Sequence, residues 1–184
     1  MKTALLIIDV QRGLFDPEPR PFEADQVMRR INQLAAQARA HSVPVVFIQH
    51  ESREGSLQFG SDGWQLAQEL DLEEGDVVLR KTTPDSFLRT ELAELLQVWE
   101  VEQVVVCGYA SEFCVDTTVR RAAAQGLDVV LVEDAHTTHD KAHMSARQIR
   151  EHHNRTLPSI RSFGSRISAL PAASLQFNTL ASAA

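Results

Sequence analysis

The sequence predicts an α/β fold in which a mostly parallel six-stranded sheet carries helices on both faces, giving three layers in a doubly wound arrangement. Short runs rich in Val, Ile and Leu alternate with longer segments of helical periodicity. The runs also lack the polar alternation expected of a sheet with one face in water. With 184 residues and 43% hydrophobic content, residues 1–184 are expected to form a single domain.

Each expected strand is a short apolar run bounded by polar or turn-forming residues. The sixth run is the least apolar of the set. In chain order, the expected strands cover residues 4–8, 45–48, 77–79, 104–107, 129–132 and 160–163.

Apolar residues at helical spacing separate most of these strands. A stripe over residues 27–38 is followed by Pro44, which opens the next strand and completes a β-α-β unit. Further stripes over residues 88–96 and 115–123 predict two more helices, the latter ended by Gly126, and a polar helix is expected over 139–153.

Two segments fall outside this alternation. Residues 51–63 hold three glycines and little apolar content, which predicts a long loop of the kind that often covers a site. The tail, residues 171–184, is expected to pack loosely or to contact another subunit.

Composition excludes several classes of protein. The net charge of −7 comes without any basic run, so nucleic acid is not an expected partner. No segment approaches the ~20 consecutive apolar residues of a membrane span and no leader pattern is present, which predicts a cytoplasmic protein. Two cysteines are too few for a disulfide framework.

Three reactive side chains are expected at the carboxyl edge of the sheet, where ligands of such folds collect. Asp9 and Lys81 each follow an apolar run, and Cys114 follows the run that ends at Cys107. Taken singly, Asp9 is more often a turn cap, Lys81 a surface residue and Cys114 a buried small hydrophobe. Cys107 is expected to be a core thiol.

The position of Cys114 favours chemistry. A thiol in the first turn of a helix lies among unpaired N–H groups and the positive end of the helix dipole, which favour the thiolate. The loop 108–113 before it can also supply N–H groups for an oxyanion hole, as acyl transfer requires.

Residues 6–11 (LIIDVQ), Arg80-Lys81 and residues 108–115 (GYASEFCV) resemble the three signatures of the isochorismatase-like hydrolases. The resemblance implies that Asp9 is the general base, that Lys81 lowers the thiol pKa, and that Cys114 is the nucleophile of an acyl-thioester mechanism. It further implies a cis peptide at Tyr109-Ala110, with the N–H groups of Ala110 and Cys114 holding the oxyanion, and a homo-oligomer, either a dimer or a tetramer.

The sequence departs from relatives that hydrolyse nicotinamide, which build a metal cluster on an Asp-x-His pair after the second strand. Here Gln49-His50 stands at that point, so neither a metal nor another cofactor is expected and His50 is expected to form hydrogen bonds. His139 and His143 are four residues apart on an expected helix, but a solvated polar face explains them better.

The expected function is hydrolysis of a C–N bond in an amide, carbamoyl or ureido group of a small molecule. Alternatives are a vinyl ether hydrolase, which the resemblance implies would need no cysteine nucleophile, a thiol redox sensor, a non-catalytic binding protein, and a metal-dependent hydrolase using His50 with His136 or His139. Candidate pocket residues are Gln11, Phe15, Trp64, Phe87 and Phe113, besides Tyr109.

Overall fold

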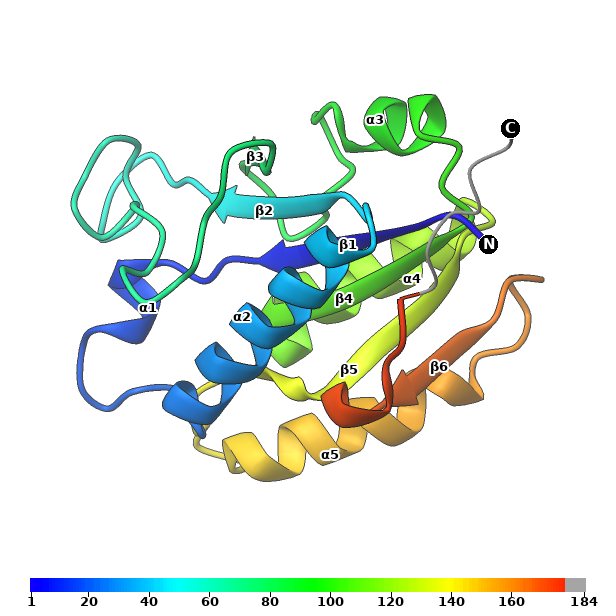
Figure 1. Ribbon diagram of the computed structural model, residues 1–184. Helices are drawn as coiled ribbons and strands as arrows, with labels where there is room; N and C mark the ends of the chain where they lie inside the picture. The colour runs from blue at the N-terminus through cyan, green and yellow to red at the C-terminus, as the bar shows by residue number, and fades with distance from the viewer. Residues whose placement is uncertain (178–184) are drawn as a thin grey trace.

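The computed structural model describes residues 1–177 and contains one six-stranded sheet of order β3-β2-β1-β4-β5-β6 (Figure 1). Every neighbouring pair is parallel. The predicted α/β, Rossmann-like fold is therefore confirmed, with a sheet that is entirely parallel. The strands are β1 Thr3–Ile8, β2 Val45–His50, β3 Val77–Lys81, β4 Gln103–Tyr109, β5 Asp128–Thr137 and β6 Ile167–Leu170.

Helices cover both faces of the sheet. Figure 1 shows α2 in front of the strands and α4 behind them. A π-helical turn, Ser111–Val115, leads directly into α4, and two short 3-10 turns follow later, at Leu157–Ser159 and Ala172–Ser174. The α-helices are α1 Arg12–Phe15, α2 Ala24–Ala40, α3 Leu92–Val98, α4 Asp116–Ala124 and α5 Ala146–Thr156.

Side chains of β1 alternate between two hydrophobic cores. Leu5 and Ile7 pack with Ile31 of α2 on one face, whereas Leu6 and Ile8 pack with Val119 of α4 on the other. All six are at most 1% exposed. Because both faces are covered, β1 is apolar at successive positions, and each such side chain contributes about 1.5–3 kcal/mol on burial.

Three expected boundaries are wrong. Helix α3 begins at residue 92 instead of 88, because Arg89 has a left-handed φ of 60° and residues 86–89 form turns. Residues 160–163 do not form a strand, because Pro158 lies in a 3-10 turn and Gly164, with φ of 89°, lies in a turn, so that β6 begins only at Ile167. The helix expected over residues 139–153 is α5, and it begins at residue 146 instead of 139. Its start is fixed by a capping box between Ser145 and Gln148, which satisfies the first N–H groups.

Gly108 allows β4 to approach β1 closely at the carboxyl edge of the sheet. Its φ is 115°, and a Cβ atom at this position would lie 2.1 Å from the carbonyl oxygen of Ile8. Only glycine adopts this conformation without strain and clash. The contact lies next to Asp9 and just before the loop that leads to Cys114.

The segment 51–63 forms no helix or strand, as predicted for a loop. Of the predicted tail, Ala172, Leu175 and Phe177 pack against the core on the α2 side, whereas residues 178–184 lie outside the described part of the chain. Within residues 1–177, no helix combines the length and apolar character that crossing a membrane would require.

Candidate active site

Three strand ends bring Asp9, Lys81 and Cys114, here called the triad, into one buried site. Asp9 follows β1, Lys81 is the last residue of β3, and Cys114 lies in the π-helical turn after β4. Strand β2 separates β1 from β3, and its last residue, His50, pairs with Lys81. The long lysine side chain therefore reaches past β2. Asp9 is 2%, Lys81 1% and Cys114 9% exposed.

The ammonium of Lys81 is the centre of this site. Its Nζ atom donates to Asp9 Oδ2 at 2.8 Å and to Cys114 Sγ at 3.1 Å. The Thr83 carbonyl oxygen and His50 Nδ1 each lie 3.2 Å from the same atom. Because an ammonium only donates, Nδ1 of His50 accepts, and the neutral imidazole then carries its proton on Nε2.

His50 is held neutral. Burial and then the positive charge of Lys81 lower its pKa, which outweighs the opposite effect of Asp9. The expected hydrogen-bonding role of His50 is thus observed, and its partner is the triad lysine.

The second carboxylate oxygen of Asp9 has no hydrogen-bond partner within residues 1–177, although it is buried. A buried carboxylate oxygen without a donor is costly unless a proton or substrate group is bound there. The other oxygen of Asp9 contacts the Lys81 ammonium, which also contacts Cys114. Asp9 Oδ1 is therefore free to accept a hydrogen bond.

The thiol differs from the expected thiolate. Burial and then the Asp9 carboxylate raise the pKa of Cys114 to about 12, and the opposing effect of Lys81 is smaller. Lys81 lowers the thiol pKa, as the resemblance implies, but burial has the larger effect and the net shift is upward. The thiol of Cys114 is therefore neutral at neutral pH.

The backbone before Cys114 is also unlike the first turn of an α-helix. The carbonyl of Ala110 accepts hydrogen bonds from the N–H groups of Phe113 and Val115, at 3.0 and 3.1 Å, which gives a π-helical turn. The peptide bond Tyr109-Ala110 is cis, as the resemblance implies. Turns of this type recur at functional sites in helical proteins.

A buried hydrogen-bond chain holds this turn, and the sequence did not reveal it. Ser111 Oγ lies 2.7 Å from His136 Nδ1, and His136 Nε2 lies 2.8 Å from Asn154 Oδ1. Asn154 Nδ2 in turn donates to the Glu133 carbonyl. The asparagine oxygen therefore accepts from Nε2, and Ser111 donates to Nδ1. Burial lowers the pKa of His136 to about 3, so the ring is neutral.

His139 and His143, expected on one helix, both lie before α5. His139 precedes α5 and its Nδ1 lies 2.8 Å from the Tyr109 hydroxyl, whereas His143 lies in the turn before α5. Burial raises the pKa of Tyr109 to about 12. Lys141 forms an ion pair with Glu112 of the π-helical turn at 3.1 Å. The segment before α5 therefore makes polar contacts with this turn.

Gln11 stabilises the backbone near the triad. Its Nε2 donates to the carbonyl oxygens of His50 and Trp64, at 2.9 and 2.8 Å, while its Oε1 accepts from the His50 N–H at 2.9 Å. Both polar atoms are used and the side chain is fully buried. Gln11, expected among the pocket residues, therefore holds the backbone at His50 and Trp64 in place.

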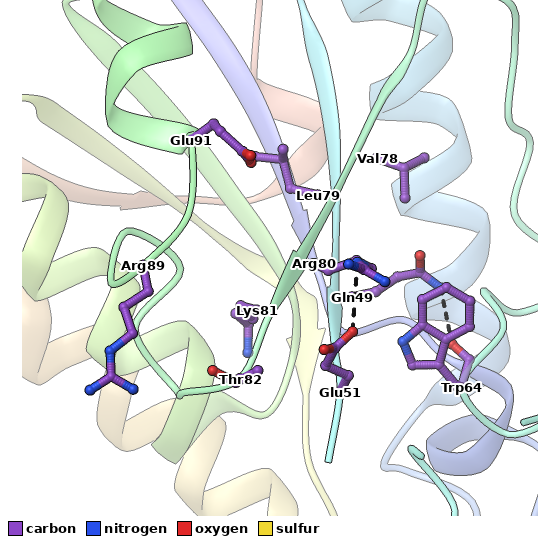
Figure 2. Close-up of a pocket in the computed structure, with 10 residues that line it drawn as sticks. All are labelled: Gln49, Glu51, Trp64, Val78, Leu79, Arg80, Lys81, Thr82, Arg89 and Glu91. Carbon is purple, nitrogen blue, oxygen red and sulfur yellow. Dashed lines mark hydrogen bonds and ion pairs between the residues drawn. The ribbon is translucent and has the colours of Figure 1, made fainter. Parts of the chain in front are cut away.

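The candidate pocket aromatics separate into different environments. Phe15 and Phe87 are 0% and 6% exposed and lie in the two cores, whereas Phe113 is 53% exposed. Trp64 lines a pocket of about 430 Å3 beside β3 (Figure 2). A dashed line in that view marks the hydrogen bond that Gln49 Nε2 donates to the Trp64 carbonyl oxygen at 3.0 Å.

Asp9, His50 and Cys114 also place three potential metal-ligand atoms within 4.8 Å of one another. The Nζ atom of Lys81 hydrogen-bonds all three. The positive charge that balances Asp9 in this cluster is therefore an ammonium, supplied by the chain itself.

The two cysteines lie on opposite faces of the sheet. Cys107 belongs to the core under α2 and is fully buried, as predicted, whereas Cys114 packs with the core under α4. Burial alone raises the pKa of the Cys107 thiol further above its ordinary value. The sheet thus separates Cys107 from Cys114, and a disulfide between them would require rearrangement.

Comparison with known proteins gives a consistent set of relatives. A family model described as the isochorismatase domain matches residues 3–161. A streptothricin hydrolase of Streptomyces noursei is 37% identical over 138 residues, which is 74% of this chain and 55% of that protein. The secreted isochorismatase effector Isc1 of Verticillium dahliae is 33% identical over 150 residues, covering 80% of this chain and 78% of that protein.

A solved structure shares both fold and sequence. The crystal structure of an isochorismatase from Pseudomonas putida KT2440 superposes with a TM-score of 0.86 at 30% identity, covering 95% of this chain and 90% of the other. The match spans only about half the length of the streptothricin hydrolases, 55% and 50% of the two proteins.

Proposed function

The chain belongs to the isochorismatase family, and we propose that it is a cysteine-dependent hydrolase that cleaves a C–N bond in an amide, carbamoyl or ureido group of a small molecule. The observation that carries the proposal is the Lys81 ammonium, which hydrogen-bonds both the Asp9 carboxylate and the Cys114 thiol in a buried site. The named hydrolase relative supports the reaction class.

The first step is formation of a thioester. The neutral thiol of Cys114 gives its proton to Asp9 as sulfur attacks the substrate carbonyl, because a thiol with a raised pKa needs a base at the moment of attack. Lys81 stays an ammonium and stabilises the negative charge that moves from Asp9 to sulfur. General-base assistance of this kind is worth about 10²–10⁴-fold in rate.

The developing oxyanion needs donors. The N–H groups of Ala110 and Cys114 are proposed for this role, since they belong to the cis peptide and the π-helical turn at the nucleophile. One such donor contributes about 10²–10³-fold to kcat. The chain from Ser111 through His136 to Asn154 would keep these groups in place.

Collapse of the tetrahedral species breaks the C–N bond. Asp9 returns its proton to the leaving nitrogen, which departs as ammonia or an amine, and the acyl group stays on the sulfur of Cys114. Water then attacks the thioester while Asp9 takes one of its protons. The C–S bond breaks, and the same proton restores the thiol.

The redox alternative is not favoured. A sensor thiol is expected to be exposed and of low pKa, with a resolving cysteine nearby. Cys114 is 9% exposed with a raised pKa, and Cys107 lies on the other face of the sheet.

The test is ammonia release from a panel of primary amides and ureido acids, with and without chelator, by the wild type and two single-cysteine variants. Cys114→Ala should lose activity by at least about 10³-fold, whereas Cys107→Ala, the matched control, should retain it. Equal activity of both variants would refute the nucleophile. Loss of activity with chelator would favour the metal-dependent alternative, and a panel left uncleaved would count against C–N hydrolysis.

A further inference from the structure

A second pocket adjoins the triad. It has a volume of about 530 Å3, and the side chain of His50 forms part of its wall. A ring nitrogen of His50, a carboxylate oxygen of Asp9 and the sulfur of Cys114 lie within 4.8 Å of one another. A substrate whose carbonyl carbon is at the sulfur can therefore place its remaining atoms in this pocket. The other lining residues are Glu51, Ser52, Arg53, Thr82 and Arg89.

Two arginines of this pocket have no protein partner. Arg53 and Arg89 form neither an ion pair nor a side-chain hydrogen bond within residues 1–177, and both are exposed. Three further arginines of the described chain, Arg29, Arg155 and Arg161, are also unpaired, but none of them lines this pocket. Most of the others are paired; Arg39, for example, lies 2.6 Å from Asp76. In a chain with a net charge of −7, acidic groups are in excess. Two of the five unpaired guanidinium groups of the described chain therefore line this pocket, which adjoins the triad.

The remaining groups of the pocket leave its positive charge in place. Its one carboxylate, Glu51, lies 3.7 Å from Arg80, which offsets the negative charge (Figure 2). His50 adds a donor, because its Nδ1 already accepts from Lys81 and the proton is on Nε2.

Arg89 lies on a fixed loop. Its φ is 60°, a left-handed conformation that is unfavourable for a long side chain. Next to it, the Phe87 N–H donates to Asp85 Oδ1 at 2.8 Å, and Thr90 Oγ1 donates to the Ser86 carbonyl at 2.6 Å. In the view of Figure 2, Thr82 and Lys81 lie between Arg89 and Glu51.

We propose that this pocket binds a carboxylate of the substrate, so that the substrate class is an amide or ureido compound that also carries a carboxylate group. The inference rests on the proposed function, since it places the reacting carbonyl at Cys114. Guanidinium groups suit a carboxylate because they donate two parallel hydrogen bonds to its two oxygens. Arg53 and Arg89 bind the carboxylate, and His50 Nε2 donates at the end nearer the sulfur.

The first experiment compares two amides of nearly equal shape. Succinamate carries a carboxylate where 4-oxopentanamide carries a neutral acetyl group, and both release one ammonia. The wild type should prefer succinamate in kcat/KM by about tenfold or more, through charge-assisted hydrogen bonds. Arg53→Gln and Arg89→Gln should each remove much of this preference, because each should raise KM for succinamate more than it changes KM for the neutral amide.

Arg29→Gln is the matched control, because Arg29 is an exposed arginine on α2 without an ion pair in the described chain. Arg29→Gln should leave kcat/KM unchanged for both substrates. Equal kcat/KM for the two amides in the wild type, or the same succinamate/4-oxopentanamide ratio in all variants, would overturn the proposal.

The second experiment needs no turnover. Iodoacetamide alkylates Cys114 by displacement of iodide, and the fully buried Cys107 serves as internal reference in the mass spectrum. Succinate, compared with chloride at equal ionic strength, should slow the alkylation in the wild type and in Arg29→Gln, but not in the double variant Arg53→Gln/Arg89→Gln. Protection in that double variant, or none in the wild type, would refute the carboxylate pocket. Protection by succinate without cleavage of any amide would instead refute the proposed function alone.

Discussion

Replacing Lys81 by Met should destabilise the fold by about 3–5 kcal/mol, the range for a buried pair that loses one partner. The Lys81 side chain is fully buried and that of Asp9 is 3% exposed, with 2.8 Å between Nζ and Oδ2. Met has a similar volume, so little cavity forms. The loss comes from leaving the Asp9 carboxylate buried without a counter-charge.

Urea unfolding at pH 7 measures this loss, with Lys81→Met, Asp9→Asn and the double variant forming a thermodynamic cycle. The double variant should be less destabilised than the sum of the single variants, by about 2 kcal/mol or more, because neither charge is then left alone. Arg147→Met is the matched control. Arg147 and Glu151 are 71% and 52% exposed, and such a pair contributes about 0.5 kcal/mol or less.

The reasoning would be refuted if Lys81→Met were no more destabilising than Arg147→Met. It would also fail if the effects of Lys81→Met and Asp9→Asn were simply additive, since additivity indicates two groups that do not interact.

Three further outcomes are expected. Burial lowers the pKa of His136 from 6.5 to about 3, so stability present above pH 6.5 is lost as the pH falls towards 3; urea unfolding should show about 2 kcal/mol more loss between pH 6.5 and 5 in the wild type than in His136→Gln. Gly108→Ala should abolish folding or cost more than about 3 kcal/mol because its Cβ would meet the Ile8 carbonyl, whereas Gly126→Ala, with φ of 89° and no atom within 4 Å, should cost about 1–2 kcal/mol by the same assay. Alkylation of Cys114 by iodoacetamide should rise about tenfold per pH unit from pH 7 to 10, since its pKa is about 12, and a plateau near pH 7 would contradict this.

The fold was predictable because its main signal is local. Both faces of β1 are buried, so residues 4–8 are apolar without interruption, and this pattern distinguishes a covered parallel sheet from a half-exposed one. The sixth strand was misplaced because residues 160–163 and β6 are both four-residue segments that mix apolar and polar side chains. The choice between them depends on pairing with β5, which is a tertiary contact.

The triad was predictable in position but not in protonation. Its three residues follow strands that end at one edge, which the order of elements reveals. The pKa of Cys114 depends on how deeply the thiol is buried and on the nearby charges of Asp9 and Lys81, and neither property can be read from the local sequence.

The hydrogen-bond chain that holds the π-helical turn at Cys114 was missed for a related reason. Ser111, His136 and Asn154 lie on three separate elements and meet only in the folded chain. The one signal in the sequence was a histidine at the end of an apolar strand, which by itself does not distinguish a structural contact from a ligand. Homo-oligomer formation and a cytoplasmic location stay predictions.

The most direct test of the account is the mass of the enzyme during turnover of a substrate that releases ammonia. Rapid acid quenching should show the acyl group of the substrate on the peptide that contains Cys114, and hydroxylamine should remove it, as expected of a thioester. Asp9→Asn should form this adduct much more slowly. The thiol of Cys114 has a raised pKa and needs a base, and the variant lacks the carboxylate that would take its proton. Turnover without an adduct on Cys114, or an adduct on any other residue, would contradict the account.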